Sequence, residues 1–379
     1  MPKEELERIH GLDFLRGFAS LAVCWAHLTS YIFETPDGPV FEAVRRVVNY
    51  GWLGVEVFFV ISGFVIPYSL HRAGYRVGAY PAFIAKRLVR LDPPYLVSIA
   101  FVLALAYAYA FFKGSAPQVD GAPVDAARVL LHLGYLNVAF GYEWLNPVFW
   151  TLALEFQYYL LVGLAFPAFV TRRAWARRLA FGCFAAASLL ADPTLADGEA
   201  PFSNFIVRFV PVFLLGTATF QFRARVVGRA EYALLLVAAG GASFYMVGWR
   251  SASAALFAVA VISFYDRRTA LADFFGRISY SLYLLHWPVG VLTFSLLGFK
   301  LLRVSSDASK IFVVCVAFVA CVAASWALYA AVERPAQRWA SRFGYGRRRA
   351  AVAASGLAPA DTTNAPAGAA LAAEADARP

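Results

Sequence analysis

An arginine and a histidine lie in the same apolar stretch near the N-terminus, the segment GLDFLRGFASLAVCWAHLTSYIF (residues 11–33). Arg16 and His27 are eleven positions apart. On an α-helix this is about three turns, so the two side chains share one face roughly 16 Å apart along the axis. Asp13 precedes Arg16 by three positions and can pair with it. Because titratable side chains inside a membrane helix are costly, we interpret this pair as functional.

Two glutamates in later apolar segments share the expected depth of His27. Glu56 and Glu155 each lie about seven or eight residues inside the expected outer end of a helix. At about 1.5 Å per residue, these glutamates and His27 lie roughly 9–12 Å below the outer membrane surface. An imidazole beside a carboxylate is the usual arrangement of a general base. We therefore predict that His27 is catalytic and that one glutamate supports it.

Sequence context favours Glu155 as that second catalytic residue. It lies in FWTLALEFQYYL, whose aromatic and polar side chains are suited to holding a sugar. Glu56 is flanked by Val and Phe residues, a pattern more typical of helix packing. We assign Glu56 to substrate binding rather than catalysis. The predicted substrate-binding residues are Glu56, Trp150, Tyr158, Tyr283 and His286, the last two from the segment ISYSLYLLHWPV.

A cluster of cations is expected at the opposite, cytoplasmic surface. The segment FIAKRLVRLDPPYL places Arg87 and Arg90 three positions apart, so on a helix they face the same way. Together with Arg16 they could form a cationic mouth that binds phosphate groups. We predict these three arginines as the residues that bind a phosphate-bearing donor. The sequence predicts neither a metal site nor a permanently bound cofactor.

Each of these residues also has a plainer explanation. Arg87 and Arg90 could be basic anchors at the cytoplasmic surface. Glu56 could belong to a buried polar network. His27 and His286 could each make a structural hydrogen bond between helices.

Apolar runs and overall composition predict an all-α, polytopic membrane protein of about ten helices. A hydrophobic content of 60%, a charged content of 15% and a mean hydropathy of +0.60 set the chain apart from soluble domains. The predicted helices span residues 12–33, 49–70, 91–112, 147–170, 178–191, 205–222, 231–248, 251–265, 278–297 and 310–332.

The distribution of basic residues predicts the orientation in the membrane. Arginines and lysines cluster in alternate loops and at the C-terminal end, whereas the intervening loops are acidic or mixed. This pattern places both termini in the cytoplasm. We expect a cytoplasmic N-terminal segment at 1–10, a transmembrane domain at 11–345 and a disordered cytoplasmic tail at 346–379.

The net charge of +10 would suggest nucleic-acid binding in a soluble protein. Here the basic residues lie in short clusters between apolar runs, so we expect no nucleic-acid partner and assign the charge to membrane orientation and anionic ligands or lipids. The four cysteines all lie in apolar runs without metal-like spacing, which is typical of small core residues.

Six blocks of sequence resemble the acyltransferase-3 family of bacterial integral-membrane O-acyltransferases. They occur in the family's order across residues 11–339: LDFLRGFASLAVCWAH, GWLGVEVFFVISGFVI, KRLVRLDPPYL, FWTLALEFQYYL, ISYSLYLLHWPV and VERPAQRW. Two departures from the family pattern are Asp92, where an aromatic or aliphatic residue is common, and Glu56, where Asp is frequent. The chain resembles the stand-alone membrane form, without the appended extracytoplasmic hydrolase-like domain of some members.

The resemblance implies a multi-pass protein of the bacterial inner membrane. It implies transfer of an acyl group, often acetyl, from cytoplasmic acyl-CoA to a hydroxyl of a carbohydrate or glycolipid. His27 would then take the proton of the acceptor hydroxyl, or accept the acyl group transiently. A polytopic transporter or carrier of a glycan or acyl compound is the alternative; a transporter predicts an inverted repeat, which the sequence lacks.

Overall fold

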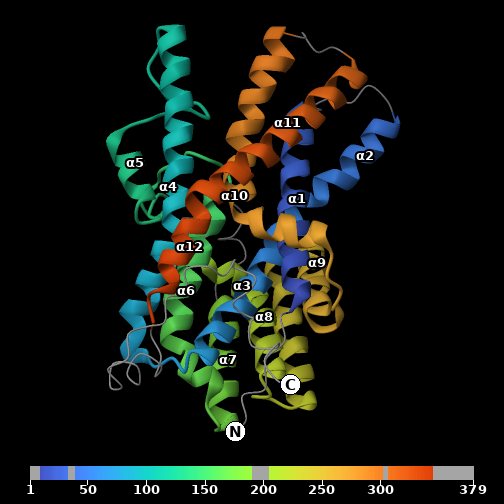
Figure 1. Ribbon diagram of the computed structural model, residues 1–379. Helices are drawn as coiled ribbons and strands as arrows, with labels where there is room; N and C mark the ends of the chain where they lie inside the picture. The colour runs from blue at the N-terminus through green and yellow to red at the C-terminus, as the bar shows by residue number, and fades with distance from the viewer. Residues whose placement is uncertain (1–8, 33–38, 190–204, 302–305, 345–379) are drawn as a thin grey trace, which may run out of the picture.

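The protein is described by a computed structural model that covers residues 9–32, 39–189, 205–301 and 306–344. The described chain is built almost entirely of helices, which confirms the predicted all-α class (Figure 1). Its strands are two short antiparallel segments, β1 (Gln118–Val119) and β2 (Ala122–Pro123). The predicted tail at 346–379 lies outside the described residues.

The longer helices follow one another along the whole described chain. They are α1 (His10–Ile32), α2 (Pro39–Asn49), α3 (Gly54–Arg72), α4 (Tyr80–Lys113), α5 (Ala126–His132), α6 (Phe149–Val170), α7 (Ala174–Leu189), α8 (Val210–Arg223), α9 (Arg229–Phe264), α10 (Ala270–Thr293), α11 (Asp307–Leu328) and α12 (Arg334–Ser341). Short 3₁₀ turns are η1 (Tyr50–Leu53), η2 (Val77–Ala79), η3 (Val138–Phe140) and η5 (Ile206–Phe209). Two π-helical segments, η6 (Phe294–Leu301) and η7 (Tyr329–Glu333), follow α10 and α11.

Within the described ranges, seven helical segments are long and apolar enough to cross a membrane. Each of the ten predicted segments coincides with helix over its described residues except for one or two residues at the ends of three of them. The chain is therefore a multi-pass membrane protein, while the number of ten crossings and the location of the termini stay predictions.

Helix α9 joins two of the predicted helices at a sharp turn. Gly248 has φ +79° and ψ 168°, a conformation that only glycine adopts readily. The predicted segments 231–248 and 251–265 are the two arms on either side of it. The prediction of a break at this point is thus confirmed.

Helix α4 starts earlier than the sequence analysis placed it. The prediction began at residue 91, after the cluster of cations, but the helix begins at Tyr80 with Pro81 in its first turn, where a missing N–H costs nothing. Arg87 and Arg90 consequently lie on the helix itself, one turn apart. Pro93 and Pro94 are accommodated inside the same helix.

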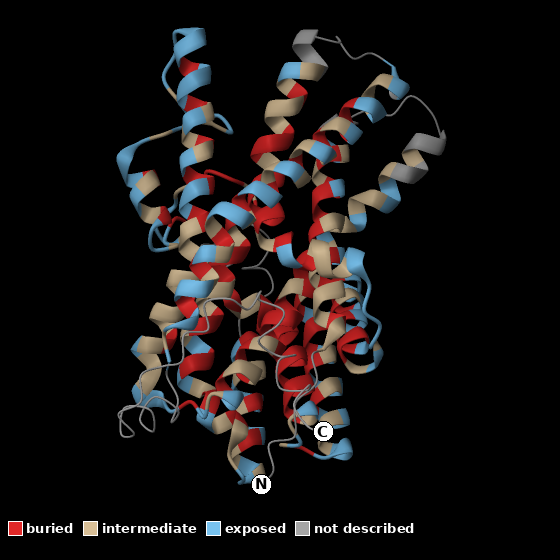
Figure 2. Ribbon diagram, in the orientation of Figure 1, coloured by how far each residue is buried: buried red, intermediate tan, exposed pale blue. Residues whose placement is uncertain are grey.

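Two glycines allow α1 and α10 to pack closely. A Cβ atom on Gly17 would lie 2.9 Å from the Cβ of Phe275, and one on Gly276 would lie 2.6 Å from the carbonyl oxygen of Asp13. Larger residues would push the two helices apart. Figure 2 shows the buried residues concentrated where the helices of the bundle meet, with exposed residues along the upper end of α4.

Candidate active site

A cavity of about 330 Å³ opens among α1, α3, α4, α6 and α10. The three predicted donor-binding arginines all line it: Arg16 from α1, and Arg87 and Arg90 from α4. Arg268 and Arg277 lie at the side of the cavity that the sequence predicts to face the cytoplasm. The structure therefore brings together the cationic cluster that the spacing of the arginines predicted.

Arg87 is held in place from several sides. Its Nη2 donates to Ser69 Oγ at 2.9 Å, and its guanidinium lies over the rings of Phe83 and Tyr159, at 5.5 and 5.4 Å from their centroids. The side chain is only 6% exposed. Such fixed geometry favours binding of a planar or bidentate anion over a loose surface contact.

Two glutamates line the same cavity, together with Asp13 and Asp273, and reduce its net positive charge. Glu155 accepts a hydrogen bond from Ser62 Oγ at 2.5 Å. Glu333 accepts one from Ser281 Oγ at 2.5 Å and one from Gln337 Nε2 at 2.9 Å. Burying these carboxylates is tolerable because each has hydroxyl partners and arginines within electrostatic reach.

His27 is not among the residues that line the cavity, and it lies beside a second histidine from α10. Its Nδ1 is 2.8 Å from Nε2 of His286, and the two rings are nearly parallel with centroids 5.1 Å apart. His286 is fully buried, and its Nδ1 is 3.0 Å from the carbonyl oxygen of Leu282. The ring of Trp287 stands edge-on to His27 at 5.6 Å.

Tyr283 connects the cavity with this histidine pair. It lines the cavity, and its hydroxyl is 2.7 Å from Thr151 Oγ1. The centroid of its ring is 5.9 Å from that of His286. A ligand held by the arginines at the mouth could therefore extend toward the histidines past Tyr283.

The structure corrects the placement of Glu155. The group that hydrogen-bonds to His27 is His286, whereas Glu155 is grouped with Ser62 and the arginines of the cavity. The predicted depth of Glu155 assumes that α6 begins at the membrane surface. Instead, Asn146 just before α6 is buried and donates to the carbonyl oxygen of Leu284, two residues from His286. Glu155 is nine residues further on, about 13 Å toward the arginines.

The predicted substrate-binding residues do not form one group. Tyr283 alone among them lines the cavity in the described structure. Glu56 accepts a hydrogen bond from Ser251 Oγ at 2.7 Å, and Tyr158 Oη lies 3.1 Å from Thr217 Oγ1 in the packing between helices.

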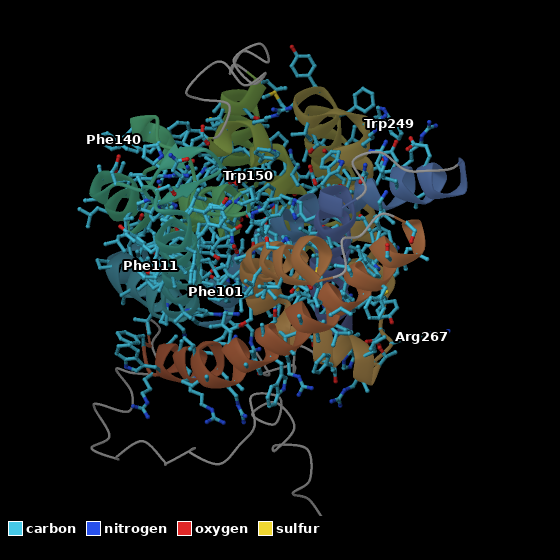
Figure 3. The ribbon with its side chains drawn as sticks, turned by 90° about the horizontal axis from the view of Figure 1, so that it is seen from above. Phe101, Phe111, Phe140, Trp150, Trp249 and Arg267 are labelled. Carbon is cyan, nitrogen blue, oxygen red and sulfur yellow. The ribbon has the colours of Figure 1, made fainter. Side chains whose placement is uncertain are left out.

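Trp150, also predicted to bind substrate, packs on Phe59 and Phe209. Seen from above, Trp150 lies further into the bundle than Trp249 and Arg267 (Figure 3). His286, the last member of the predicted set, lies against His27 instead of lining the cavity.

Sequence reasoning missed two residues that shape the site. Glu333 lies in the block VERPAQRW and lines the cavity. Its position between the apolar end of α11 and a basic helix could have marked it as a candidate site residue. Asn146 sets the depth of α6, but its partner is a backbone carbonyl on a distant helix, and no local pattern in the sequence reveals such a contact.

A small cap built from the segment between α4 and α6 fixes the start of α6. Arg128 donates from its guanidinium to five backbone carbonyls, those of Val119, Ala122, Pro123, Glu143 and Trp144. His132 Nε2 accepts from the N–H of Leu145 at 3.0 Å, and burial lowers the pKa of His132 to about 4.

Comparisons with known proteins identify the family. The model of the acyltransferase-3 family, an acyltransferase domain, matches residues 9–330. The acyltransferase MdmB of Streptomyces mycarofaciens is 27% identical over 382 residues, which cover 90% of this chain and 94% of MdmB. The O-acetyltransferase OatA of Staphylococcus aureus (strain NCTC 8325 / PS 47) is 30% identical over 161 residues, which cover 41% of this chain and 24% of OatA. No solved structure matches the chain.

Proposed function

This chain belongs to the acyltransferase-3 family and is a membrane enzyme that transfers acyl groups, and on that premise we propose its donor, its acceptor and its site. The donor is acyl-CoA, with acetyl-CoA as the first candidate, taken from the cytoplasm. The acceptor is a hydroxyl of a carbohydrate or glycolipid, and the enzyme resides in the bacterial inner membrane. Membership of an enzyme family leaves the transporter alternative without support.

The observation that carries the proposal is the convergence of Arg16, Arg87 and Arg90 on one cavity. CoA bears phosphates at its nucleotide end, and guanidinium groups bind phosphate through paired, charge-assisted hydrogen bonds. Its long arm, with the thioester at the tip, would enter the cavity and run toward Tyr283. The nucleotide phosphates would bind the arginines at the cationic mouth.

His27 supplies the base in this proposal. The imidazole takes the proton from the acceptor hydroxyl while the hydroxyl oxygen attacks the thioester carbonyl carbon. As the tetrahedral intermediate collapses, the carbon–sulfur bond breaks and the CoA sulfur takes up the proton that His27 holds. An acyl-histidine intermediate is the variant of this scheme in which His27 itself attacks the thioester first.

The donor half of the proposal is tested by binding and hydrolysis. Purified protein in detergent is titrated with acetyl-CoA in a calorimeter, and slow release of free CoA is followed with a thiol reagent. We expect saturable binding that weakens steeply with salt. Absence of binding in folded protein would refute acyl-CoA as the donor.

The acceptor half is tested in cells of the source organism. Surface glycans from a deletion strain are compared by mass spectrometry with those from strains complemented with the wild-type protein or with His27→Ala. We expect one acyl modification to disappear on deletion and to return with the wild-type protein only. If every carbohydrate and glycolipid fraction is unchanged, the proposed acceptor class is wrong.

A further inference from the structure

We propose that His286 is a positioning residue that fixes the tautomer of His27 and leaves Nε2 of His27 as its basic atom. Hydrogen-bonding geometry alone determines the tautomer of His27. What Nε2 then does to a substrate rests on the proposed function. His286, which the sequence placed in the substrate-binding set, thereby has a different role.

The backbone of α10 determines which nitrogen of His286 carries a proton. Nδ1 of His286 lies 3.0 Å from the carbonyl oxygen of Leu282, one helical turn earlier. A carbonyl oxygen accepts hydrogen bonds and cannot donate them. Nδ1 of His286 therefore carries a proton and donates it to Leu282.

His286 carries no second proton. Its side chain is fully buried, and within the described residues no carboxylate hydrogen-bonds to either histidine ring. A buried imidazolium without a carboxylate would bear the full cost of desolvation, so His286 is neutral. A neutral imidazole with its proton on Nδ1 has only a lone pair on Nε2.

The tautomer of His27 follows from that lone pair. Its Nδ1 is 2.8 Å from Nε2 of His286, and a hydrogen bond at this distance needs a proton between the two atoms. Because His286 cannot supply it, Nδ1 of His27 donates. In neutral His27 the proton on Nδ1 leaves Nε2 unprotonated, and Nε2 lies on the edge of the ring away from His286.

The hydrogen bonds between Leu282 and His286 and between His286 and His27 thus take the place of the carboxylate that usually orients a catalytic imidazole. A neutral acceptor holds the ring without placing a second ion in an apolar interior, where desolvation offsets much of the attraction between charges. The close packing at Gly17 and Gly276 keeps the two helices near enough for this contact.

The tautomer is measured directly by nitrogen NMR on full-length protein labelled with [¹⁵N]histidine. The chain has 5 histidines, so their signals can be assigned from single substitutions. We expect His27 to show a protonated Nδ1 and a pyridine-type Nε2 in the absence of any substrate. A protonated Nε2 on neutral His27 overturns the proposal, and this result does not depend on what the enzyme acylates.

Two substitutions test the effect of the acceptor on turnover. In His286→Gln the amide oxygen can take the place of Nε2, whereas His286→Leu offers no acceptor. With acetyl-CoA as the donor, we expect His286→Leu to lower kcat at least about a hundredfold with little change in KM for the donor, and His286→Gln to recover at least about tenfold of that loss. His71→Leu, on α3 against Phe220, is the matched control and should leave kcat unchanged.

Equal activity of His286→Leu and wild type would overturn the positioning role. A similar loss in both variants, with the Nδ1–H tautomer of His27 retained, would also overturn it. If wild-type protein shows that tautomer but neither binds nor turns over acetyl-CoA, the proposed donor is wrong. The proposed role of His286 in fixing the tautomer of His27 is then still supported.

Discussion

His27 and His286 each lie ten residues beyond a glycine at a close contact between their two helices. Gly17 precedes His27 by ten positions on α1, and Gly276 precedes His286 by ten positions on α10. Two residues at equal spacing from a shared contact point lie at the same height along the helix axes only if the two helices run in the same direction. The hydrogen bond of 2.8 Å between the two rings is therefore a consequence of helix register as well as of residue type.

Replacement of His27 by alanine should abolish acyl transfer while leaving the fold intact. The substitution removes the imidazole that we propose as the general base, and general base catalysis alone contributes about 10²- to 10⁴-fold. Transfer is measured with radiolabelled acetyl-CoA in membranes, and folding by size-exclusion profile and thermal melting. His71→Ala serves as control, and near wild-type transfer by His27→Ala would rule out its catalytic role.

The arginine cluster could be predicted because its signal is local. Arg87 and Arg90 are three positions apart, so any helix places them on one face. Because α4 begins at Tyr80, both arginines lie on this helix, and they still share one face. The ten apolar segments were also readable because membrane helices are long and their backbone groups must bond internally.

The partner of His27 could not be predicted because it depends on where each helix begins in depth. Counting from the start of a helix works only when that start lies at the membrane surface. Asn146 is buried at the level of Leu284, so α6 begins inside the protein and carries Glu155 to the arginine cavity. The pairing of His27 with His286 joins residues 259 positions apart, a contact that no local spacing encodes.

Substituting lysine for Arg90 should weaken binding of acetyl-CoA by about tenfold. Lysine keeps the charge but loses the planar fork that makes two parallel hydrogen bonds to phosphate, and one charge-assisted bond is worth about 1.5 kcal/mol or more. Binding is measured by calorimetry at fixed salt. Arg173→Lys, an exposed arginine in the turn between α6 and α7, is the matched control. Unchanged affinity for acetyl-CoA in both Arg90→Lys and Arg87→Ala would show that the two arginines serve only as basic anchors at the cytoplasmic surface.

Replacing Glu155 by glutamine should act on donor binding rather than on the base. Glutamine preserves an acceptor for Ser62 but removes a negative charge from the cavity that holds Arg16. We expect acetyl-CoA to bind about two- to fivefold more tightly, the magnitude of one weak ion pair, with kcat within about threefold of wild type.

The matched control for Glu155→Gln is Glu56→Gln, whose parent residue bonds to Ser251 and does not line the cavity. It should leave the affinity for acetyl-CoA unchanged. A hundredfold loss of kcat in Glu155→Gln with unaltered binding would show that Glu155 supports His27 after all, despite its place among the arginines.

Acidification should destabilise the cap that fixes the start of α6. Burial lowers the pKa of His132 to about 4 from its ordinary value of 6.5, so between these values the unfolded chain binds a proton that the folded cap excludes. The stability contributed by neutral His132 is complete above pH 6.5 and is lost as the pH falls toward 4. The full effect is about 3 kcal/mol, since each pKa unit corresponds to about 1.4 kcal/mol. Protonation would also place a hydrogen on Nε2, opposite the N–H of Leu145 that it now accepts.

Thermal melting of the purified protein between pH 4.5 and 8 measures this loss. In wild type the melting temperature should fall as the pH drops below 6.5. In His132→Gln the melting temperature should start lower and depend less on pH, because the substituted side chain does not titrate. His71→Gln removes an exposed histidine from α3 and should change the pH dependence less than His132→Gln does. If His132→Gln and wild type lose the same stability over this range, His132 does not link the cap to pH.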